Sequence, residues 1–500
     1  MKTIVYLFLL THFFFCSCKT EKEIFNPEKK FSAELLKRDY KLFRNILEES
    51  HPSLYWYISK DSLDYYFDLA YSGIRDSMTE SQFRMLLSYV ITKIDCGHTV
   101  IKNSKKYSKY LDSAQLKTFP LGLKFWGDTM IVTANLNRRD SVLRRGTVLK
   151  SINGLTQLQL RDTFFNYLST DGHSECGKYQ SLSTGFAFAS LYKNIFGLPE
   201  RFDIHYIDSI GQDEQTTIPL YDFRADTMNR MDFSVDHLSK HRKKNPPQFS
   251  FFSSSNLQLD TVGSTAFMTL NTFDRSNHLR KFFRQTFSAL EKNHIHYLII
   301  DVRSNGGGDA GISTLLTSYI IDRKFKLADS LYALNRSSKY NEYIDKSFLY
   351  NTMMFFVTKK KSDGKYHFGY FERNYFKPKK NHHFNGQVYI LIGGNSFSAT
   401  TLFAGSLKGQ KNVTLVGEET GGGYYGNTAW IIPDVTLPNT KLRFRLPRFR
   451  LVIDKNRERN GQGVMPDVWA VPSAEAIRKG IDFKVEKVRS LIVSQNDQKK

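Results

Sequence analysis

The feature that most constrains this chain is a strand, a tight turn and a helix in direct succession between residues 386 and 407. The apolar run VYILI at 388–392 breaks at two glycines, and helical spacing resumes at 399–407. A serine in such a turn lies beside the first free N–H groups of the helix, where a developing negative charge would be stabilised. The turn therefore predicts either a reactive serine, at Ser396 or Ser398, or serines that only cap the helix.

A second strand also ends in an unusual turn. The β-branched run HYLIIDV at 296–302 is typical of a buried parallel strand, and it is followed by RSNGGG at 303–308. Adjacent glycines let the backbone approach a bound group and turn N–H donors toward it. A phosphate-binding loop is not favoured, because the stretch lacks both a Gly-Lys-Ser/Thr ending and the G-x-G-x-x-G spacing.

Four segments in this order carry a resemblance: LIIDVRSNGGG at 298–308, SFSATTLFAGSLK at 396–408, LVGEETGGG at 415–423 and GVMPD at 463–467. Together they resemble the serine peptidase family that includes the C-terminal processing proteases and the tricorn core peptidase. The resemblance covers about residues 260–470. It implies Ser398 as nucleophile and an oxyanion hole built from the N–H of Ala399 with that of Gly307 or Gly308. It implies no metal or organic cofactor.

The resemblance also bears on the general base. The processing proteases use a lysine about twenty-five residues after the serine, where this chain has Gly423, and Lys408 and Lys411 lie at the far end of the serine's helix. The tricorn-like branch takes a histidine from far upstream, and DCGHT at 95–99 resembles its motif. We therefore expect His98 to be the base, because an imidazole titrates near neutral pH.

The third catalytic residue is left open by the sequence. The tricorn-like pattern has a serine before the histidine, replaced here by Gly97, and a glutamate shortly before GVMPD. Either Glu458, displaced by two positions, or Asn460 would then orient the imidazole, since an amide can do so by a hydrogen bond. Cys96 is an alternative nucleophile near the histidine, but no oxyanion hole is evident beside it.

The N-terminus predicts export and anchoring. Lys2 is followed by an apolar run at 4–15, which is too short to span a bilayer and suits a secretory signal. The Cys-Ser-Cys sequence at 16–18 resembles a bacterial lipoprotein signal, so we expect Cys18 to be lipidated and the protein to be tethered in the bacterial cell envelope, at the periplasm or outer membrane. An ordinary signal peptide cut nearby is the alternative.

The net charge of +22 is spread over short basic runs, such as 241–244, 359–361 and 377–380. No nucleic-acid-binding motif accompanies these runs, so solvated loops are the first interpretation. Attraction to anionic envelope polymers or acidic peptides is the second.

The expected fold class is α/β with an N-terminal helical bundle. The family resemblance implies a Clp/crotonase-like catalytic domain, and the stretch LGLKFWGDTM…RDTF at 121–164 resembles a PDZ domain, so we also expect a PDZ-like domain. The expected parts are a signal peptide at 1–18, the helical region at 19–110, the PDZ-like domain at 111–222, a linker at 223–262, the catalytic domain at 263–475 with a basic, tyrosine-rich insertion at 323–384, and a C-terminal helix and tail at 476–500.

The expected function is a serine endopeptidase of the cell envelope that cleaves peptide C-termini or unfolded chains through an acyl-enzyme. A catalytically silent scaffold that binds peptides or another ligand is the alternative. An α/β-hydrolase fits poorly, because the turn lacks the G-x-S-x-G glycines and the candidate histidine precedes the serine.

Overall fold

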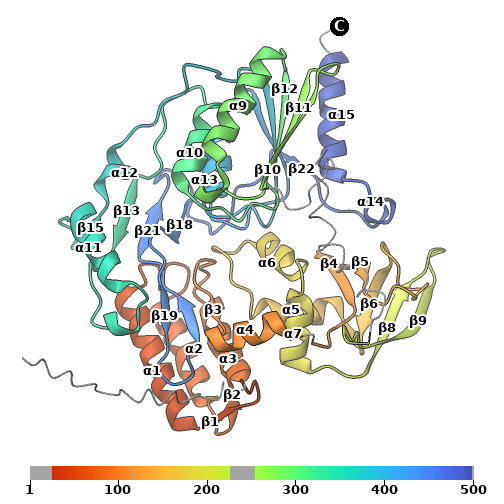
Figure 1. The fold of residues 1–500 in the computed structure, drawn as a ribbon, viewed down its shortest axis with the longest axis vertical. Coiled ribbons are helices and arrows are strands. Elements are labelled where there is room, and N and C mark those ends of the chain that lie inside the picture. The colour runs from red at the N-terminus through yellow and green to blue at the C-terminus, as the bar shows by residue number, and fades with distance from the viewer. Residues whose placement is uncertain (1–24, 115, 226–253, 498–500) are drawn as a thin grey trace, which may run out of the picture.

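The structure is a computed structural model that describes residues 25–114, 116–225 and 254–497. The expected signal peptide, Cys18 and most of the expected linker lie outside the described residues. Figure 1 shows three parts: a helical region, a module of antiparallel strands with helices, and a larger α/β domain. No described helix combines the length and the apolar character that a membrane span requires.

The α/β domain is built on a six-stranded sheet in the order β10-β11-β12-β16-β17-β22. Its strands are β10 Ser255–Asp260, β11 Thr265–Leu270, β12 Tyr297–Asp301, β16 Gln387–Ile392, β17 Val413–Gly417 and β22 Val468–Trp469. All neighbouring pairs are parallel except β10 and β11, which form an antiparallel hairpin. The expected linker is therefore too long at its C-terminal end, since β10 belongs to the sheet.

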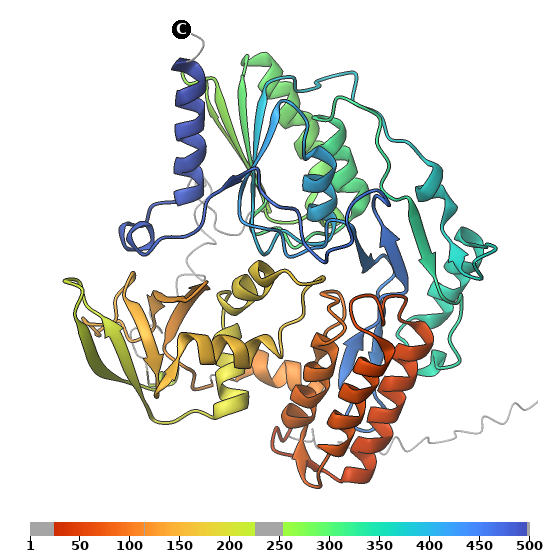
Figure 2. The same cartoon turned by 180° about the vertical axis from the view of Figure 1, so that it is seen from behind.

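Helices cover both faces of this sheet, as Figures 1 and 2 show. Helices α9 (Leu279–Lys292), α10 (Ala310–Ser318) and α13 (Ala399–Leu407) share one core with alternate strand side chains such as Leu298, Ile300 and Ile390. The other strand side chains, including Ile299 and Tyr389, pack with helix α15 (Phe483–Asp497), which follows α14 (Ala474–Lys479). Burial on both faces explains why these strands are continuous apolar runs.

The insertion at 323–384 contains β13 Ser330–Ala333, the 3-10 turn η3 Asn341–Tyr343, α11 Ser347–Val357, β14 Lys359–Lys360, β15 Tyr366–His367 and α12 Gly369–Arg373. Its strands join β18 Gly426–Ala429 and β21 Phe449–Val452 in a second sheet of order β14-β15-β13-β21-β18. The insertion is therefore an integral part of the α/β domain.

The helical region consists of β1 Lys30–Phe31, α1 Ala33–Ser50, α2 Lys60–Ser72, β2 Met78–Thr79, α3 Glu80–Thr92, β3 Ile101–Lys102 and α4 Lys105–Ser113. Its core is shared with the hairpin of β19 (Asp434–Thr436) and β20 (Arg443–Arg445), which contributes Val435, Leu437 and Phe444. Strand β3 also pairs with β20. The loop that carries His98 is thus fixed between helix α3 and a strand of the α/β domain.

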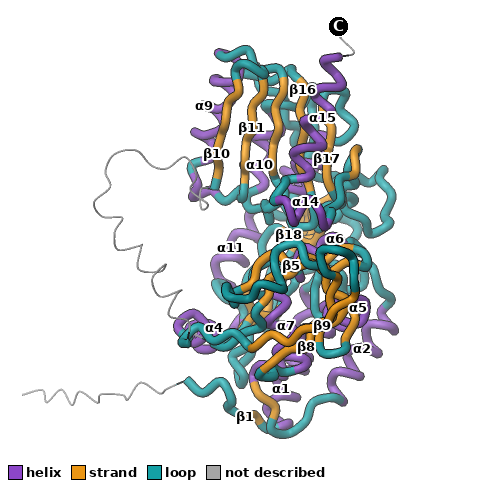
Figure 3. Tube along the Cα trace, turned by 90° about the vertical axis from the view of Figure 1, so that its right-hand side faces the viewer, coloured by secondary structure: helices purple, strands orange, loops and turns teal. Residues whose placement is uncertain are grey.

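The module that lies between the helical region and the α/β domain in the sequence has an antiparallel sheet of order β4-β5-β6-β8-β9, with β7 paired to β6. It comprises β4 Leu121–Trp126, β5 Thr129–Asn135, β6 Val148–Ile152, β7 Leu155–Thr156, α5 Gln157–Phe165, α6 Glu175–Leu182, α7 Ala187–Phe196, β8 Arg201–Ile207 and β9 Asp213–Pro219. In Figure 3 this module lies below the six-stranded sheet. Peptide binding by this module remains a prediction.

Candidate functional site

The turn between β16 and α13 gives its two serines different roles. Ser396 is buried, and its Oγ donates to the carbonyl of Val302 (2.9 Å) and accepts from the N–H of Gly393 (3.2 Å). Ser398 is half-buried, has φ 56° and ψ −121°, and makes no capping bond to the helix that it precedes. Positive φ is unfavourable for a non-glycine residue and is often found at active sites. Ser396 therefore stabilises the turn, whereas the hydroxyl of Ser398 forms no hydrogen bond with any residue that the structure describes.

The glycine loop after β12 lies directly against this turn. A Cβ atom built on Gly307 would lie 2.7 Å from the Cβ of Ser398 and 3.0 Å from the N of Ala399, so only glycine fits there. The N–H of Gly307 already donates to Oδ1 of Asn305 (2.9 Å). Within the described residues, the N–H groups of Gly308 and Ala399 have no hydrogen-bond acceptor. Gly308 and Ala399 are therefore the donors left free for an oxyanion.

His98 lies beside the same turn but is not hydrogen-bonded to Ser398. Its buried ring packs on the ring of Phe397, with centroids 4.5 Å apart and an interplanar angle of 35°. Neither imidazole nitrogen has a hydrogen-bond partner among the described residues. The Nδ1 atom lies 3.6 Å from Oδ1 of Asp171. The structure thus places the imidazole between the residue before the serine and a buried carboxylate.

Asp171 is a further candidate site residue, which the sequence alone does not predict. It is buried, and its Oδ1 accepts from the N–H of Gly97 (2.9 Å), while its own N–H donates to the carbonyl of Gly421 (3.4 Å). A Cβ atom on Gly423 would lie 3.7 Å from the Cβ of Asp171. The position where the processing proteases have their lysine therefore lies against this aspartate. The only local signal was an Asp-Gly dipeptide, which predicts a turn and not a partner for His98.

Glu458 and Asn460 are not brought to His98. Both are exposed, and the Nδ2 of Asn460 contacts Oε2 of Glu458 at 3.3 Å. Two neighbouring arginines fix this loop: Arg457 lies 3.8 Å from the ring centroid of Tyr424, and Arg459 lies 3.8 Å from that of Trp56. Neither Glu458 nor Asn460 is hydrogen-bonded to His98 in the structure, and the buried carboxylate near Nδ1 is that of Asp171. An orienting role for residue 458 or 460 stays a prediction.

Buried polar groups surround the His98 loop. Burial, together with the charge of Asp171, raises the pKa of the Cys96 thiol to about 11, so at neutral pH this cysteine is a poor nucleophile. Burial also lowers the pKa of His51, which hydrogen-bonds to Thr99 (2.9 Å), to about 3. The buried guanidinium of Arg450 lies 3.5 Å from the ring centroid of Trp56. A cysteine-based site is not favoured by this environment.

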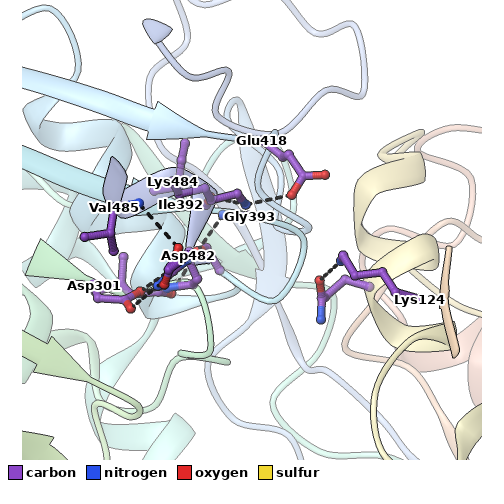
Figure 4. A network of polar contacts seen from close by, with 12 residues as sticks. Lys124, Asp301, Ile392, Gly393, Glu418, Asp482, Lys484 and Val485 are labelled. Atoms are coloured by element: carbon purple, nitrogen blue, oxygen red, sulfur yellow. Dashed lines mark hydrogen bonds and ion pairs between the residues drawn. The ribbon is translucent and has the colours of Figure 1, made fainter. Parts of the chain in front are cut away.

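A network of ion pairs ties the C-terminal helix to the carboxyl ends of the central strands (Figure 4). Arg303 bonds Asp301 at 2.6 Å and Asp482 through two nitrogens at 2.7 Å. Lys484 bonds Glu418 at 2.6 Å and the carbonyl of Ile392 at 3.2 Å. These bonds fix both ends of the site, since Arg303 precedes the glycine loop and Ile392 precedes the serine turn.

A cavity of about 400 Å³ lies beside this network, between the sheet and the antiparallel module. Lys124 and Gln180 line it from the module, and Ser304 lines it next to the glycine loop. The described residues contain no group of three or more His, Cys, Asp or Glu side chains arranged to hold a metal ion.

Comparison with known proteins finds similarities to the α/β part and to the overall fold. Residues 264–470 match peptidase family S41. No curated protein matches the sequence. Among solved structures, mature CPAF is 15% identical with a TM-score of 0.61, covering 92% of this chain and 97% of CPAF. Mature CPAF complexed with lactacystin is 14% identical, with a TM-score of 0.61 and coverage of 92% and 98%.

A putative peptidase from Parabacteroides merdae is 13% identical, with a TM-score of 0.47 and coverage of 93% and 98%. The CPAF likeness extends over nearly the whole chain, so the mixed α/β fold is common to both proteins. Residues 264–470 therefore resemble peptidase family S41, and the chain shares its overall mixed α/β fold with CPAF.

Proposed function

We propose that this protein is a serine peptidase that cleaves peptide bonds through an acyl-enzyme on Ser398. The observation that carries the proposal is the strained turn at Ser398. Within the described residues, it leaves the Ser398 hydroxyl and the N–H groups of Gly308 and Ala399 without hydrogen-bond partners. The preceding Phe397 packs on His98, whose Nδ1 lies 3.6 Å from the buried Asp171. Developing negative charge on a substrate carbonyl oxygen would be stabilised by the N–H groups of Ala399 and Gly308.

In the proposed mechanism His98 takes the proton of Ser398 as the hydroxyl attacks the carbonyl carbon. His98 then gives this proton to the leaving amine, and water releases the acyl group by the reverse steps. In the structure Nδ1 lies 3.6 Å from Oδ1 of Asp171. As the imidazole turns toward Ser398, Nδ1–H would donate to this carboxylate, which leaves Nε2 as the base. Because neither ring nitrogen is hydrogen-bonded, the imidazole can turn toward Ser398 without breaking an existing bond.

The substrate class proposed is the C-terminal region of peptides or unfolded chains. The module at 116–222 supports this, because a sheet edge can bind an extended peptide by adding a strand. The proposal also includes a PDZ-like module, a Clp/crotonase-like catalytic domain, and a lipid anchor at Cys18 that holds the protein in the cell envelope.

Peptide turnover by the purified chain tests the assignment. Ser398→Ala, His98→Ala and Asp171→Asn are each expected to lower kcat by about three orders of magnitude. Glu458→Gln is the matched control, because this exposed carboxylate forms no hydrogen bond with the imidazole of His98, and it should keep wild-type turnover. Equal activity of Ser398→Ala and wild type would refute the nucleophile. A large loss in Glu458→Gln with none in Asp171→Asn would refute the proposed orienting residue.

A catalytically silent, ligand-binding scaffold is the second candidate, and the absence of a hydrogen bond between His98 and Ser398 favours it. A fluorophosphonate probe separates the two, since it reacts only with an activated serine. Stoichiometric labelling that disappears in Ser398→Ala supports the peptidase. Absence of labelling at a saturating probe concentration supports the scaffold.

A further inference from the structure

Helix α11 (Ser347–Val357) presents an apolar face that is largely exposed, although the guanidinium of Arg336 lies 5.1 Å from the ring centroid of Phe355. Phe348 is 84% exposed, Phe356 79%, Phe355 62% and Leu349 60%. At 100° per residue, the exposed positions from 348 to 356 fall within an arc of about 160° on one side of the helix. The opposite side carries Met354, which is fully buried in a core of the insertion. The helix is therefore anchored by one face and offers the other to a partner.

The position of α11 makes this face accessible. Figures 1 and 2 show the insertion at the outer side of the molecule, with α11 at its edge and away from the module of antiparallel strands. Single exposed apolar side chains are common on protein surfaces, whereas several large ones on one contiguous face mark an interaction site.

The surroundings of the face are basic. Lys346 precedes the helix, Lys359 and Lys360 follow it, all three are exposed, and none forms an ion pair with a described residue. The segment 336–380 holds eleven lysines and arginines against four aspartates and glutamates, so its net charge is positive. An apolar helix face with lysines at both ends is complementary to a surface that is apolar inside and negatively charged at its boundary.

We propose that α11 is an interfacial helix that inserts its phenylalanines into an anionic lipid surface. A second copy of this chain fits less well, because in a two-fold contact the same patch meets itself and the lysines at its ends would face like charges. The lipid surface instead pairs the lysines with headgroup phosphates while it covers Phe348 and Phe356. This proposal does not depend on the catalytic assignment.

Vesicle binding tests the proposal with the full chain and two lipid compositions, phosphatidylcholine alone and an equal mixture with phosphatidylglycerol. Wild type should sediment preferentially with the anionic vesicles. The variant Phe348→Ser/Phe356→Ser should need at least about tenfold more anionic lipid for half-binding. The variant Lys359→Gln/Lys360→Gln should need about fivefold more anionic lipid for half-binding for each lysine removed. It should also lose most of the preference for anionic over neutral vesicles.

Two comparisons make the result specific. Phe186→Ser/Val262→Ser removes two other exposed apolar side chains and should bind like wild type. All variants share one N-terminus, so any anchor there contributes equally. Equal lipid binding by wild type, Phe348→Ser/Phe356→Ser and Lys359→Gln/Lys360→Gln would overturn the proposal. Dissociation of a wild-type dimer by Phe348→Ser/Phe356→Ser in sedimentation velocity, with unchanged vesicle binding, would assign the face to self-association and would overturn it as well.

Discussion

Replacing Gly97 by alanine should disable the site without unfolding the protein. A Cβ atom at this position would lie 2.7 Å from Cζ and 2.9 Å from Cε2 of Phe397, and 3.2 Å from the N of Asp171. Ordinary contacts between carbon atoms are about 3.5–4.0 Å. The Phe397 ring must therefore move by about 1 Å, and this ring both supports the imidazole of His98 and precedes the nucleophile.

The size of the effect follows from this displacement. Overpacking by one methyl group typically costs about 1–3 kcal/mol of stability. A misplacement of about 1 Å between reacting groups can lower the rate about 100-fold. We therefore expect Gly97→Ala to lose about two orders of magnitude in kcat, while the free energy of unfolding falls by no more than about 3 kcal/mol.

The assay compares peptide turnover and the rate of fluorophosphonate labelling with urea unfolding of the same samples. Gly73→Ala is the matched control, because its φ is −75° and an added Cβ would meet its nearest atom at 3.4 Å. In the double variant Gly97→Ala/Phe397→Leu the smaller side chain should relieve the clash and recover part of the labelling rate, a coupling that a double-mutant cycle measures. Full turnover by Gly97→Ala would refute the reasoning.

Two further predictions concern stability. Burial lowers the pKa of His51 to about 3, so as pH falls below about 6.5 the unfolded chain takes up a proton that the folded protein excludes, and stability is lost. Between pH 7 and pH 5 the free energy of unfolding, measured in urea, should fall by about 2 kcal/mol more in wild type than in His51→Gln. An equal fall in both proteins would contradict the burial of this imidazole. Asp482→Asn removes the paired bonds to Arg303 and should weaken the start of α15 by about 1 kcal/mol, seen as faster amide hydrogen exchange there. Glu486→Gln removes only the exposed ion pair with Arg489 on the same helix and should leave amide exchange unchanged. Identical exchange in both variants would show that the bonds of Asp482 to Arg303 do not stabilise the start of α15.

The central sheet could be predicted from the sequence because its signals are local. Strands buried on both faces, such as 297–301 and 387–392, are continuous apolar runs, and each is followed by a glycine-containing turn. The serine turn was predictable for the same reason. Strand β10 was not, since Ser255–Asp260 is a partly exposed edge strand with polar residues and no apolar run.

The candidate site could be predicted only in part, because its members come from distant segments. Ser398 and the glycine loop have local signatures. Asp171 has none, since its role depends on contacts with Gly97 and Gly421 that only the folded chain creates. The spacing of Glu458 from GVMPD suggests a catalytic carboxylate, but this spacing contains no information on the exposure of its side chain or on the packing of Arg457 on Tyr424 and of Arg459 on Trp56.

The core shared by the first helices and the β19–β20 hairpin has a consequence for biogenesis. Leu36 and Phe43 leave the ribosome some four hundred residues before Val435 and Phe444, the partners that complete their packing. During synthesis the N-terminal helices must therefore persist with an unfinished hydrophobic surface, which is a target for chaperones and proteases. A fragment that ends before residue 435 should aggregate, and a separately expressed 264–470 segment should lack both His98 and the cover for its own hairpin.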